Sequence, residues 1–262
     1  MNKLDKIIAQ KKIEVATLQE LIAKNKQHPI AKILEMGSNQ ANTKFKTALT
    51  TDKLAIIAEI KRRSPSKGNL AEIADPIKLA EEYAKGGANA LSILTDKEFF
   101  AGSIEDLSIV AKETTLPILR KDFIIDPLQI AEAVYAGADA ILLIVAALGK
   151  NTKALLAETK RLGLSALVEV HNEAELNIAL ESGAEIIGIN NRDLTTFIID
   201  THTALHLGEK TPKNIIKIAE SGILHAHLAH TYYQAGFNGV LMGEALVTSA
   251  DPAAFIRACK HG

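Results

Sequence analysis

A repeat of eight short apolar runs constrains the fold of this chain more than any other feature. The runs begin at residues 54, 90, 116, 139, 165, 185, 214 and 238, so that after the first gap successive starts lie 20 to 29 residues apart. This spacing holds a strand, a loop and one helix of about ten residues, which is the βαβ repeat. The runs are mainly Ile, Leu, Val and Ala, as in parallel strands covered on both faces. Eight such units predict an α/β fold, a closed (β/α)8 TIM barrel of about 250 residues.

Helix signals between the runs support this repeat. The segments DPIKLAEEYAKGG and DPLQIAEAVYAGA begin with an N-cap at Asp75 and Asp126, continue with proline, and end in glycine. The alternative is an open, doubly wound sheet, which usually has fewer strands and needs a topological switch point. No GxGxxG motif follows the first run, which excludes the common dinucleotide-binding version of that sheet.

About 50 residues precede the first run and are predicted to form a helical extension. HPIAKILEMG has the pattern of a short helix, and a longer one is indicated by apolar residues near helical spacing, namely Leu4, Ile7, Ile8, Val15, Leu18 and Ile22. The extension either plugs the bottom of the barrel or covers it beside the active site, and periodicity leaves both interpretations open. The whole chain, residues 1–262, is expected to form a single barrel domain.

Composition excludes several classes of partner. The chain has 30 Lys and Arg against 31 Asp and Glu, so no global field attracts nucleic acid or an anionic membrane. The N-terminus is too polar for a signal peptide, and no apolar run approaches the ~18 residues of a membrane span. The single cysteine, Cys259, rules out an intrachain disulfide, and a cytoplasmic location is expected. Composition leaves the oligomeric state open, and a monomer or weak oligomer is expected.

Polar side chains close six of the eight predicted strands. Because the chemistry of this fold lies at the carboxyl ends of the strands, these positions are the candidate site. Burying so many charges is unfavourable unless they pair or meet a ligand, so we predict that they line a pocket: Glu59, Lys61, Lys121, Glu169, Asn190, Arg192, Glu220, Ser221, Gly222, Gly243 and Glu244.

Two turns indicate that the ligand carries a phosphate. Ser221-Gly222 and Gly243-Glu244 follow the seventh and eighth runs, where barrel enzymes commonly bind phosphate through backbone N–H groups. Lys61 and the adjacent RRSPSK run, which includes Ser64, add positive charge there, although such a run is also typical of a solvated loop.

Aromatic and histidine residues outside these turns give weaker signals. Phe99, Phe100 and Phe123 follow the second and third runs; they indicate either ordinary packing or a flat aromatic substrate. HAHLAH, residues 225–230, lies in a predicted helix without a supporting carboxylate, and we expect no metal site there.

The motifs at the strand ends resemble those of indole-3-glycerol phosphate synthase, the ring-closing enzyme of tryptophan biosynthesis. The resemblance runs from about residue 50 to the C-terminus and rests on these segments: IIAEIKRRSPSKG, LTDKEFFAGS, LPILRKDFIIDPLQI, ADAILLIVA, LVEVH, IGINNRDL, IAESGI and LMGEAL. It implies a carboxy-lyase without metal or organic cofactor. Such an enzyme converts 1-(2-carboxyphenylamino)-1-deoxyribulose 5-phosphate to indole-3-glycerol phosphate, carbon dioxide and water.

The resemblance also implies a role for each site residue. Lys121 would be the general acid on the substrate ketone, and Glu169 the acid/base partner in the later dehydration. Glu59 and Lys61 would assist the reacting centre. The remaining roles are in binding. The substrate hydroxyls and carboxylate would be positioned by Asn190, Arg192 and Ser64, and the anilino side would contact Glu220. The phosphate would be bound by Lys61, Ser221, Gly222, Gly243 and the amide of Glu244, and the anthranilate ring would be enclosed by Phe100, Phe123 and Leu194.

One departure from the family pattern and three rival functions stay open at the level of sequence. Ala245 stands where family members often carry a hydroxyl residue, which leaves the phosphate contacts in question. A barrel aldolase would use Lys121 to form a Schiff base. A phosphosugar isomerase would usually pair a cysteine with an aspartate, and Cys259 is far from any predicted strand end. A non-catalytic phosphate-binding scaffold would give no reason for Lys121 and Glu169 to face each other.

Overall fold

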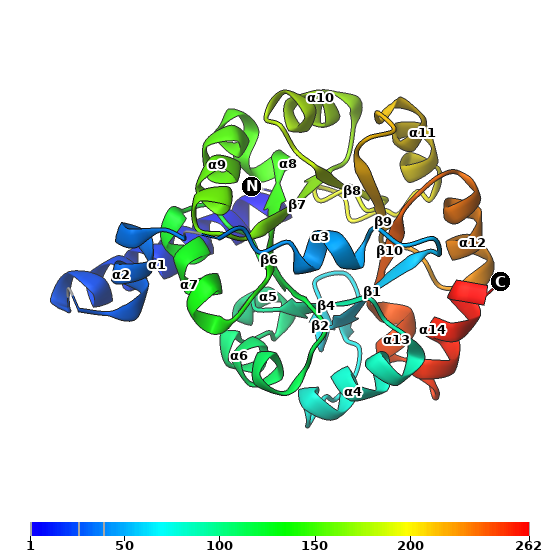
Figure 1. Cartoon of the computed structure of the whole chain (residues 1–262), viewed down its shortest axis with the longest axis horizontal. Coiled ribbons are helices and arrows are strands. Elements are labelled where there is room, and N and C mark those ends of the chain that lie inside the picture. Colours follow the sequence, from blue (N-terminus) through cyan, green and yellow to red (C-terminus); the bar gives the residue numbers. More distant parts are fainter. Residues whose placement is uncertain (1, 26, 39, 262) are drawn as a thin grey trace.

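Eight parallel strands close into a barrel in the computed structural model, which describes residues 2–25, 27–38 and 40–261. Neighbouring strands follow one another around the ring, and β1 pairs with both β4 and β10 to close it (Figure 1). The prediction of a (β/α)8 barrel is therefore confirmed. Its strands are β1 (Ala55–Ile60), β4 (Ala90–Leu94), β5 (Ile118–Lys121), β6 (Ala140–Ile144), β7 (Ser165–Val170), β8 (Ile186–Asn190), β9 (Ile216–Glu220) and β10 (Gly239–Met242).

Helices surround this ring on the outside (Figure 1). The predicted N-caps are present, because the Asp75 carboxylate accepts the N–H groups of Ile77 and Lys78, and that of Asp126 accepts the N–H of Leu128. The helices that connect successive strands are α4 (Pro76–Gly86), α6 (Ile104–Glu113), α7 (Pro127–Ala136), α9 (Thr152–Arg161), α10 (Glu173–Glu181), α11 (His202–Lys210) and α12 (Ala226–Gln234), and α14 (Pro252–His261) follows the last strand. Shorter helices lie in the loops: α5 (Lys97–Phe100), α8 (Val145–Leu148), the 3-10 helix η1 (Gly149–Asn151) and α13 (Glu244–Val247).

The core has two zones because alternate side chains of each strand point to opposite faces. One zone lies between strands and helices, where Ile56, Leu91 and Val168 are completely buried. The other fills the barrel interior, where Leu119, Leu167 and other strand residues pack together. Burial on both faces explains why the strands appear in the sequence as continuous apolar runs.

The N-terminal extension contacts both ends of the barrel. Its helices are α1 (Lys3–Lys24), α2 (Pro29–Met36) and α3 (Lys44–Ala48), and in Figure 1 α3 lies across the centre of the strand ring. Phe45 and Leu49 of this segment are fully buried in the interior zone, and Lys46 Nζ lies 2.5 Å from Glu185 Oε2, just before β8. Thus α3 closes the bottom of the barrel, as one of the two interpretations of the extension expected.

The other interpretation, a cover beside the carboxyl ends of the strands, holds for α1. Lys11 of α1 is 1% exposed, and its ammonium lies 2.8 Å from each of three carboxylates, those of Glu14, Asp96 and Asp122. Asp96 follows β4 and Asp122 follows β5 directly after Lys121. This buried cluster therefore joins the extension to the carboxyl ends of two strands.

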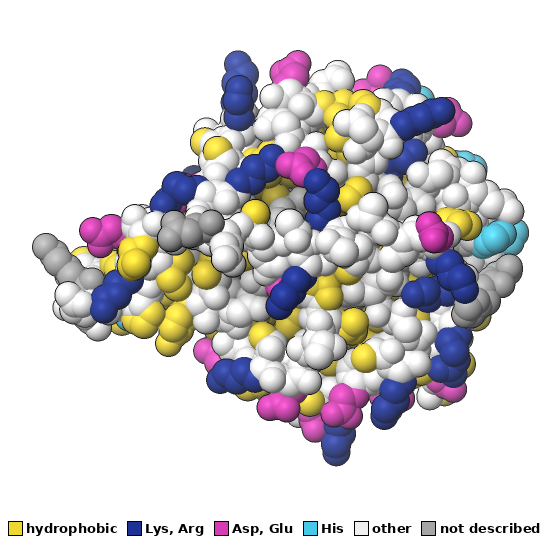
Figure 2. Space-filling model, viewed as in Figure 1, with side chains coloured by type: hydrophobic (Ala, Val, Ile, Leu, Met, Phe, Trp, Pro, Cys, Tyr) yellow, Lys and Arg dark blue, Asp and Glu magenta, His cyan; other side chains and the backbone are white. Residues whose placement is uncertain are grey.

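Charges of both signs are interspersed on the barrel face shown in Figure 2, in agreement with the balanced composition. Hydrophobic side chains gather at the left of this view, over α1 and α2. Ile13, Leu21 and Met36 of these two helices are exposed. None of the helices in the described ranges is long and apolar enough to cross a membrane.

Candidate active site

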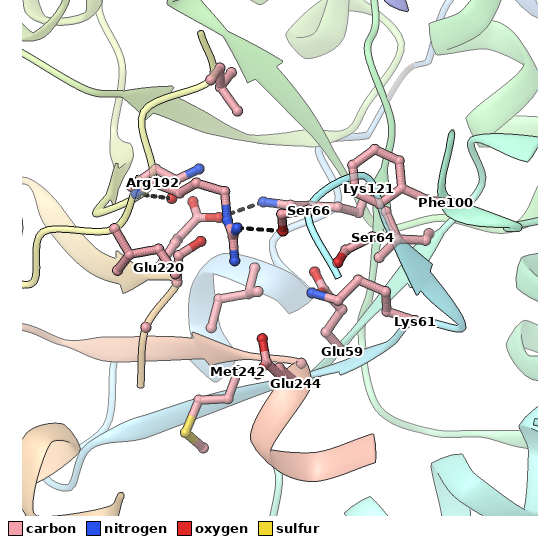
Figure 3. Close-up of a pocket in the computed structure, with 18 of the residues that line it drawn as sticks. Glu59, Lys61, Ser64, Ser66, Phe100, Lys121, Arg192, Glu220, Met242 and Glu244 are labelled. Atoms are coloured by element: carbon pink, nitrogen blue, oxygen red, sulfur yellow. Dashed lines mark hydrogen bonds and ion pairs between the residues drawn. The ribbon is translucent and has the colours of Figure 1, made fainter. Parts of the chain in front are cut away.

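One pocket at the carboxyl ends of the strands contains every residue to which the sequence analysis gave a role, whereas Phe99, considered there with Phe100 and Phe123, does not line it. Figure 3 shows their polar groups converging on a common space. The strands place them there because the charged residues lie at the carboxyl ends of strands or directly after them. The predicted residues in the lining are Glu59, Lys61, Ser64, Phe100, Lys121, Phe123, Glu169, Asn190, Arg192, Leu194, Glu220, Ser221, Gly222, Gly243 and Glu244.

The centre of the pocket is the ammonium group of Lys121, at the end of β5. Its Nζ lies 3.1 Å from Glu169 Oε2 on β7 and also donates a hydrogen bond to Glu220 Oε2 on β9. Burial acts to lower the pKa of Lys121, but the charges of Glu220, Glu169 and Glu59 outweigh it and hold that pKa above its ordinary value. Lys121 is therefore protonated at neutral pH, as a proton donor must be, whereas a Schiff-base lysine needs a lowered pKa.

The two carboxylates that share Lys121 differ in charge state. Burial would raise the pKa of Glu169, yet the charges of Lys121 and His171 keep it below its ordinary value. Burial raises the pKa of Glu220 to about 7, partly opposed by Lys121 and reinforced by the charge of Glu169. At neutral pH the pocket therefore holds one carboxylate that is ionised and a second that can be protonated.

A second ion pair, Glu59 with Lys61, lies at the end of β1. Lys61 Nζ is 2.6 Å from Glu59 Oε1, and the Glu59 side chain is almost fully buried. Gly243 leaves room for this carboxylate, since a Cβ there would lie 2.3 Å from Glu59 Oε1. In the same way a Cβ at Gly188 would lie 2.0 Å from Glu220 Oε1, so both carboxylates occupy space that only glycine leaves free.

The turns after β9 and β10 line the pocket with Ser221, Gly222, Gly243 and Glu244. Ser221 and Gly222 both have positive φ, 65° and 76°, and α13 begins at Glu244 directly after Gly243. The first N–H groups of a helix have no partner inside it, so they are available to an anion. The Glu244 carboxylate contacts Lys67 Nζ, which leaves the Glu244 amide as the donor for the pocket.

The RRSPSK segment, which the sequence analysis treated as a loop, forms a short hairpin together with the two residues that follow it. Its strands are β2 (Arg63–Ser64) and β3 (Gly68–Asn69), which pair antiparallel. The hairpin turn contacts the opposite side of the pocket, since Arg192 Nη1 donates to Ser66 Oγ at 2.9 Å (Figure 3). Ser66 and Lys67 therefore line the pocket as well, although the sequence analysis did not select them individually.

Apolar side chains form one wall of the pocket. The rings of Phe100 and Phe123 have centroids 6.2 Å apart and are tilted by 37°, and Leu194 also belongs to the lining. Phe100 ends the short helix α5, whose N-cap is Asp96, one of the three partners of Lys11. The buried cluster around Lys11 thus holds the helix that carries this ring.

Residues considered as alternatives lie outside this pocket. His227 and His230 are on α12, as expected, and within the described ranges no group of three or more His, Cys, Asp or Glu residues could hold a metal ion. Cys259 is buried on α14, with its Sγ 4.0 Å from Met242 Sδ. Cys259 therefore packs between α14 and the outer face of the strands.

His171 is a polar neighbour of the site that the sequence analysis did not select. Its Nε2 lies 3.2 Å from Glu169 Oε1, and its Nδ1 lies 2.9 Å from Glu175 Oε2. The available signal was its position in LVEVH, two residues after Glu169 and so on the same side of an extended chain.

Comparisons with known proteins agree with this geometry. The family model of indole-3-glycerol phosphate synthase matches residues 4–259. The indole-3-glycerol phosphate synthase of Mycolicibacterium gilvum is 50% identical over 206 residues, which cover 78% of this chain and 76% of that protein. The enzyme of the same name from Mycolicibacterium smegmatis is 43% identical over 250 residues, or 95% and 90% of the two chains. A solved structure, thiamine phosphate pyrophosphorylase from Pyrococcus furiosus, aligns with a TM-score of 0.59 at 14% identity over 83% of this chain and 95% of that one, and this likeness concerns the fold alone.

Proposed function

The chain belongs to the indole-3-glycerol phosphate synthase family, and from this premise we propose which of its residues carry the reaction. The reaction closes the indole ring of 1-(2-carboxyphenylamino)-1-deoxyribulose 5-phosphate and releases carbon dioxide and water in tryptophan biosynthesis. The chain is thus a carboxy-lyase that acts on a small phosphorylated substrate. The proposed assignments give the role of each residue of the pocket in this reaction.

Lys121 is the general acid of ring closure in this proposal. When the carboxylate-bearing ring carbon attacks the ketone carbon, the ketone oxygen gains negative charge and needs a proton. The observation that carries the assignment is the Lys121 ammonium, held between the carboxylates of Glu169 and Glu220 in the pocket. These two carboxylates keep the amine protonated until the substrate oxygen takes the proton.

Glu169 acts in the dehydration that follows loss of carbon dioxide. Because its pKa is held below the ordinary value, it is ionised and takes a proton from the indoline intermediate as the hydroxyl leaves. Lys61, oriented by Glu59 at 2.6 Å, is the second ammonium of the pocket and assists the leaving hydroxyl. Asn190, which also lines the pocket, orients the substrate beside Glu169.

Binding is divided between two parts of the pocket. The phosphate is held by Lys61 and by the backbone N–H groups of Ser221, Gly222, Gly243 and Glu244. Ser64 and Arg192 bind the substrate carboxylate and hydroxyls, and Glu220 contacts the anilino nitrogen. Phe100, Phe123 and Leu194 enclose the anthranilate ring, which suits the apolar wall that these three residues form.

Further expectations concern the whole chain. We expect one domain over residues 1–262, because α1 and α3 pack against opposite ends of one barrel. We also expect a cytoplasmic enzyme without nucleic-acid or membrane partners, which is a monomer or weak oligomer and needs no cofactor.

One assay tests the proposed chemistry. Purified protein in buffer alone should generate indole fluorescence from the anilino-deoxyribulose phosphate, and borohydride added during turnover should trap no adduct on Lys121. A covalent substrate adduct on Lys121 would overturn the acid role and favour a Schiff base.

A further inference from the structure

Each oxygen of Glu169 faces a different cation. Glu169 Oε2 lies 3.1 Å from Lys121 Nζ, and Oε1 lies 3.2 Å from His171 Nε2. The second contact is an ion pair rather than an aligned hydrogen bond. The Glu169 carboxylate is 2% exposed and the His171 ring 10% exposed, so water screens this pair little.

Glu175 holds the imidazole from the other side. Its Oε2 lies 2.9 Å from His171 Nδ1 and also accepts the backbone N–H of His171 at 2.9 Å. Its Oε1 accepts a hydrogen bond of 2.6 Å from Asn172 Nδ2. Both oxygens of Glu175 are therefore engaged, and the ring has a fixed orientation. The result is a line of alternating charge that runs Glu175, His171, Glu169, Lys121, Glu220.

The surroundings of the ring favour its charged form. Burial acts to lower the pKa of His171, but the charges of Glu169 and Glu175, together with the hydrogen bond to Glu175, raise it to about 10. These carboxylates come from β7 and α10, while Asn190 on the neighbouring β8 carries no charge. Two more helices pack on β7, and their buried faces are uncharged: Val145 and Leu148 of α8, and Thr152, Leu155, Leu156 and Thr159 of α9.

The imidazolium distinguishes two otherwise similar carboxylates. Glu169 and Glu220 both contact Lys121 and are 2% and 1% exposed. Within the described part of the chain, Glu220 Oε1 has no hydrogen-bond partner, whereas Oε1 of Glu169 faces His171. One ammonium cannot fully stabilise two buried carboxylates. The cation at position 171 therefore decides which of them stays ionised.

We propose that His171, fixed by Glu175, is a positioning residue that orients Glu169 and keeps it in the carboxylate form required for the dehydration step. This inference rests on the role of Glu169 proposed above. His171 does not line the pocket, so it acts on the substrate through Glu169.

The pH profile of His171→Gln tests the inference. An opposite charge at this distance lowers a carboxyl pKa by about 1–3 units, so its loss should raise the pKa of Glu169 by a similar amount. Glu169 would then be protonated below the new pKa and ionised above it. The acid limb of kcat should move to higher pH by about 1–3 units. The loss of kcat should therefore grow as the pH falls through this limb and disappear toward pH 9, with KM within about twofold.

A matched control is His206→Gln, since His206 forms an exposed pair with Glu173, with Nε2 3.1 Å from Oε1. This variant should keep the wild-type profile. An unmoved acid limb in His171→Gln, or a loss that is equal at every pH, would overturn the positioning role. If Glu169→Gln retained turnover, the proposed role of Glu169 would fail instead, so the two failures are distinguishable.

A second measurement covers the case in which His171→Gln does not fold. Nitrogen-15 NMR of the wild-type imidazole should show both ring nitrogens of His171 protonated at pH 8, where exposed histidines are neutral. In Glu175→Gln the titration midpoint of this ring should fall. A neutral His171 ring at pH 8 would refute the inference without any change to the site.

Discussion

Replacing Lys121 with methionine separates the chemical step from binding. The substitution keeps the length and apolar stem of the side chain but removes the proton donor. General acid catalysis typically contributes about 10²–10⁴-fold, so kcat should fall by that factor, which corresponds to about 3–5 kcal/mol in the barrier. A product-like phosphorylated ligand should still bind within about tenfold, because the phosphate contacts come from β9 and β10.

The same substitution has a calculable effect on stability. It leaves Glu169 and Glu220 buried without their ammonium, and breaking a buried pair costs about 3–5 kcal/mol. Glu220, whose pKa is already about 7, can relieve this by taking up a proton. Because its folded pKa then lies even further above the unfolded value, the loss of stability should grow as pH rises and be smallest below about pH 6.

The assay follows from these two effects. Single-turnover formation of indole fluorescence at pH 6.5 gives the chemical rate, and urea unfolding at pH 6 and pH 9 gives the stability. Lys217→Met is the control, since Lys217 is a buried lysine whose ammonium donates to the carbonyl of Gly208 rather than to the pocket. It should keep kcat. Near-full turnover of Lys121→Met, or a variant that is unfolded even at pH 6, would refute our assignment of the acid.

Three further predictions concern the extension, the phosphate and metals. Lys11→Met should lower the free energy of unfolding by about 3–5 kcal/mol, because Asp96 and Asp122 would stay buried without their ammonium partner. Lys24→Met, at an exposed position, should change the free energy of unfolding by less than about 0.5 kcal/mol. Equal losses in the two variants would contradict the anchoring role of Lys11. Gly222→Val should raise KM at least tenfold, since its φ of 76° is strained for valine and a Cβ would lie 2.7 Å from Ile199; an unchanged KM would remove Gly222 from the phosphate site. Activity should survive dialysis against EDTA, and a loss restored by a divalent cation would show a metal requirement.

The sequence allowed the barrel and its pocket lining to be predicted because both depend on local periodicity. A strand buried on both faces needs apolar residues throughout, so a charge at its end is conspicuous. Alternation then determines which side that charge occupies, as for Glu59 and Lys61. Once eight strands close a barrel, residues at equivalent ends must converge, even when they are far apart in the chain, as Lys121 and Glu220 are.

Residues that depend on the packing of distant segments could not be predicted in this way. Lys11 lies on the apolar stripe of α1 between Ile7 and Val15, and a charge there is a signal. Two of its three partners, however, are in the loops that follow β4 and β5. His171 acts only because α10 places Glu175 against its ring. The contact of Lys67 with Glu244 likewise depends on how the β2–β3 hairpin folds back over the pocket.

The N-terminal extension, which touches both ends of the barrel, is synthesised before the strands that it contacts. Asn42 bonds to a residue 97 positions later and Lys46 to one 139 positions later, so these contacts need long loops to close. At about 5–20 residues per second of synthesis, the partner of Lys46 emerges roughly 7–28 s after it. During that interval Leu4, Ile7 and Val15 have no barrel to pack against. This apolar stripe is therefore a surface that a ribosome-associated chaperone would cover during synthesis.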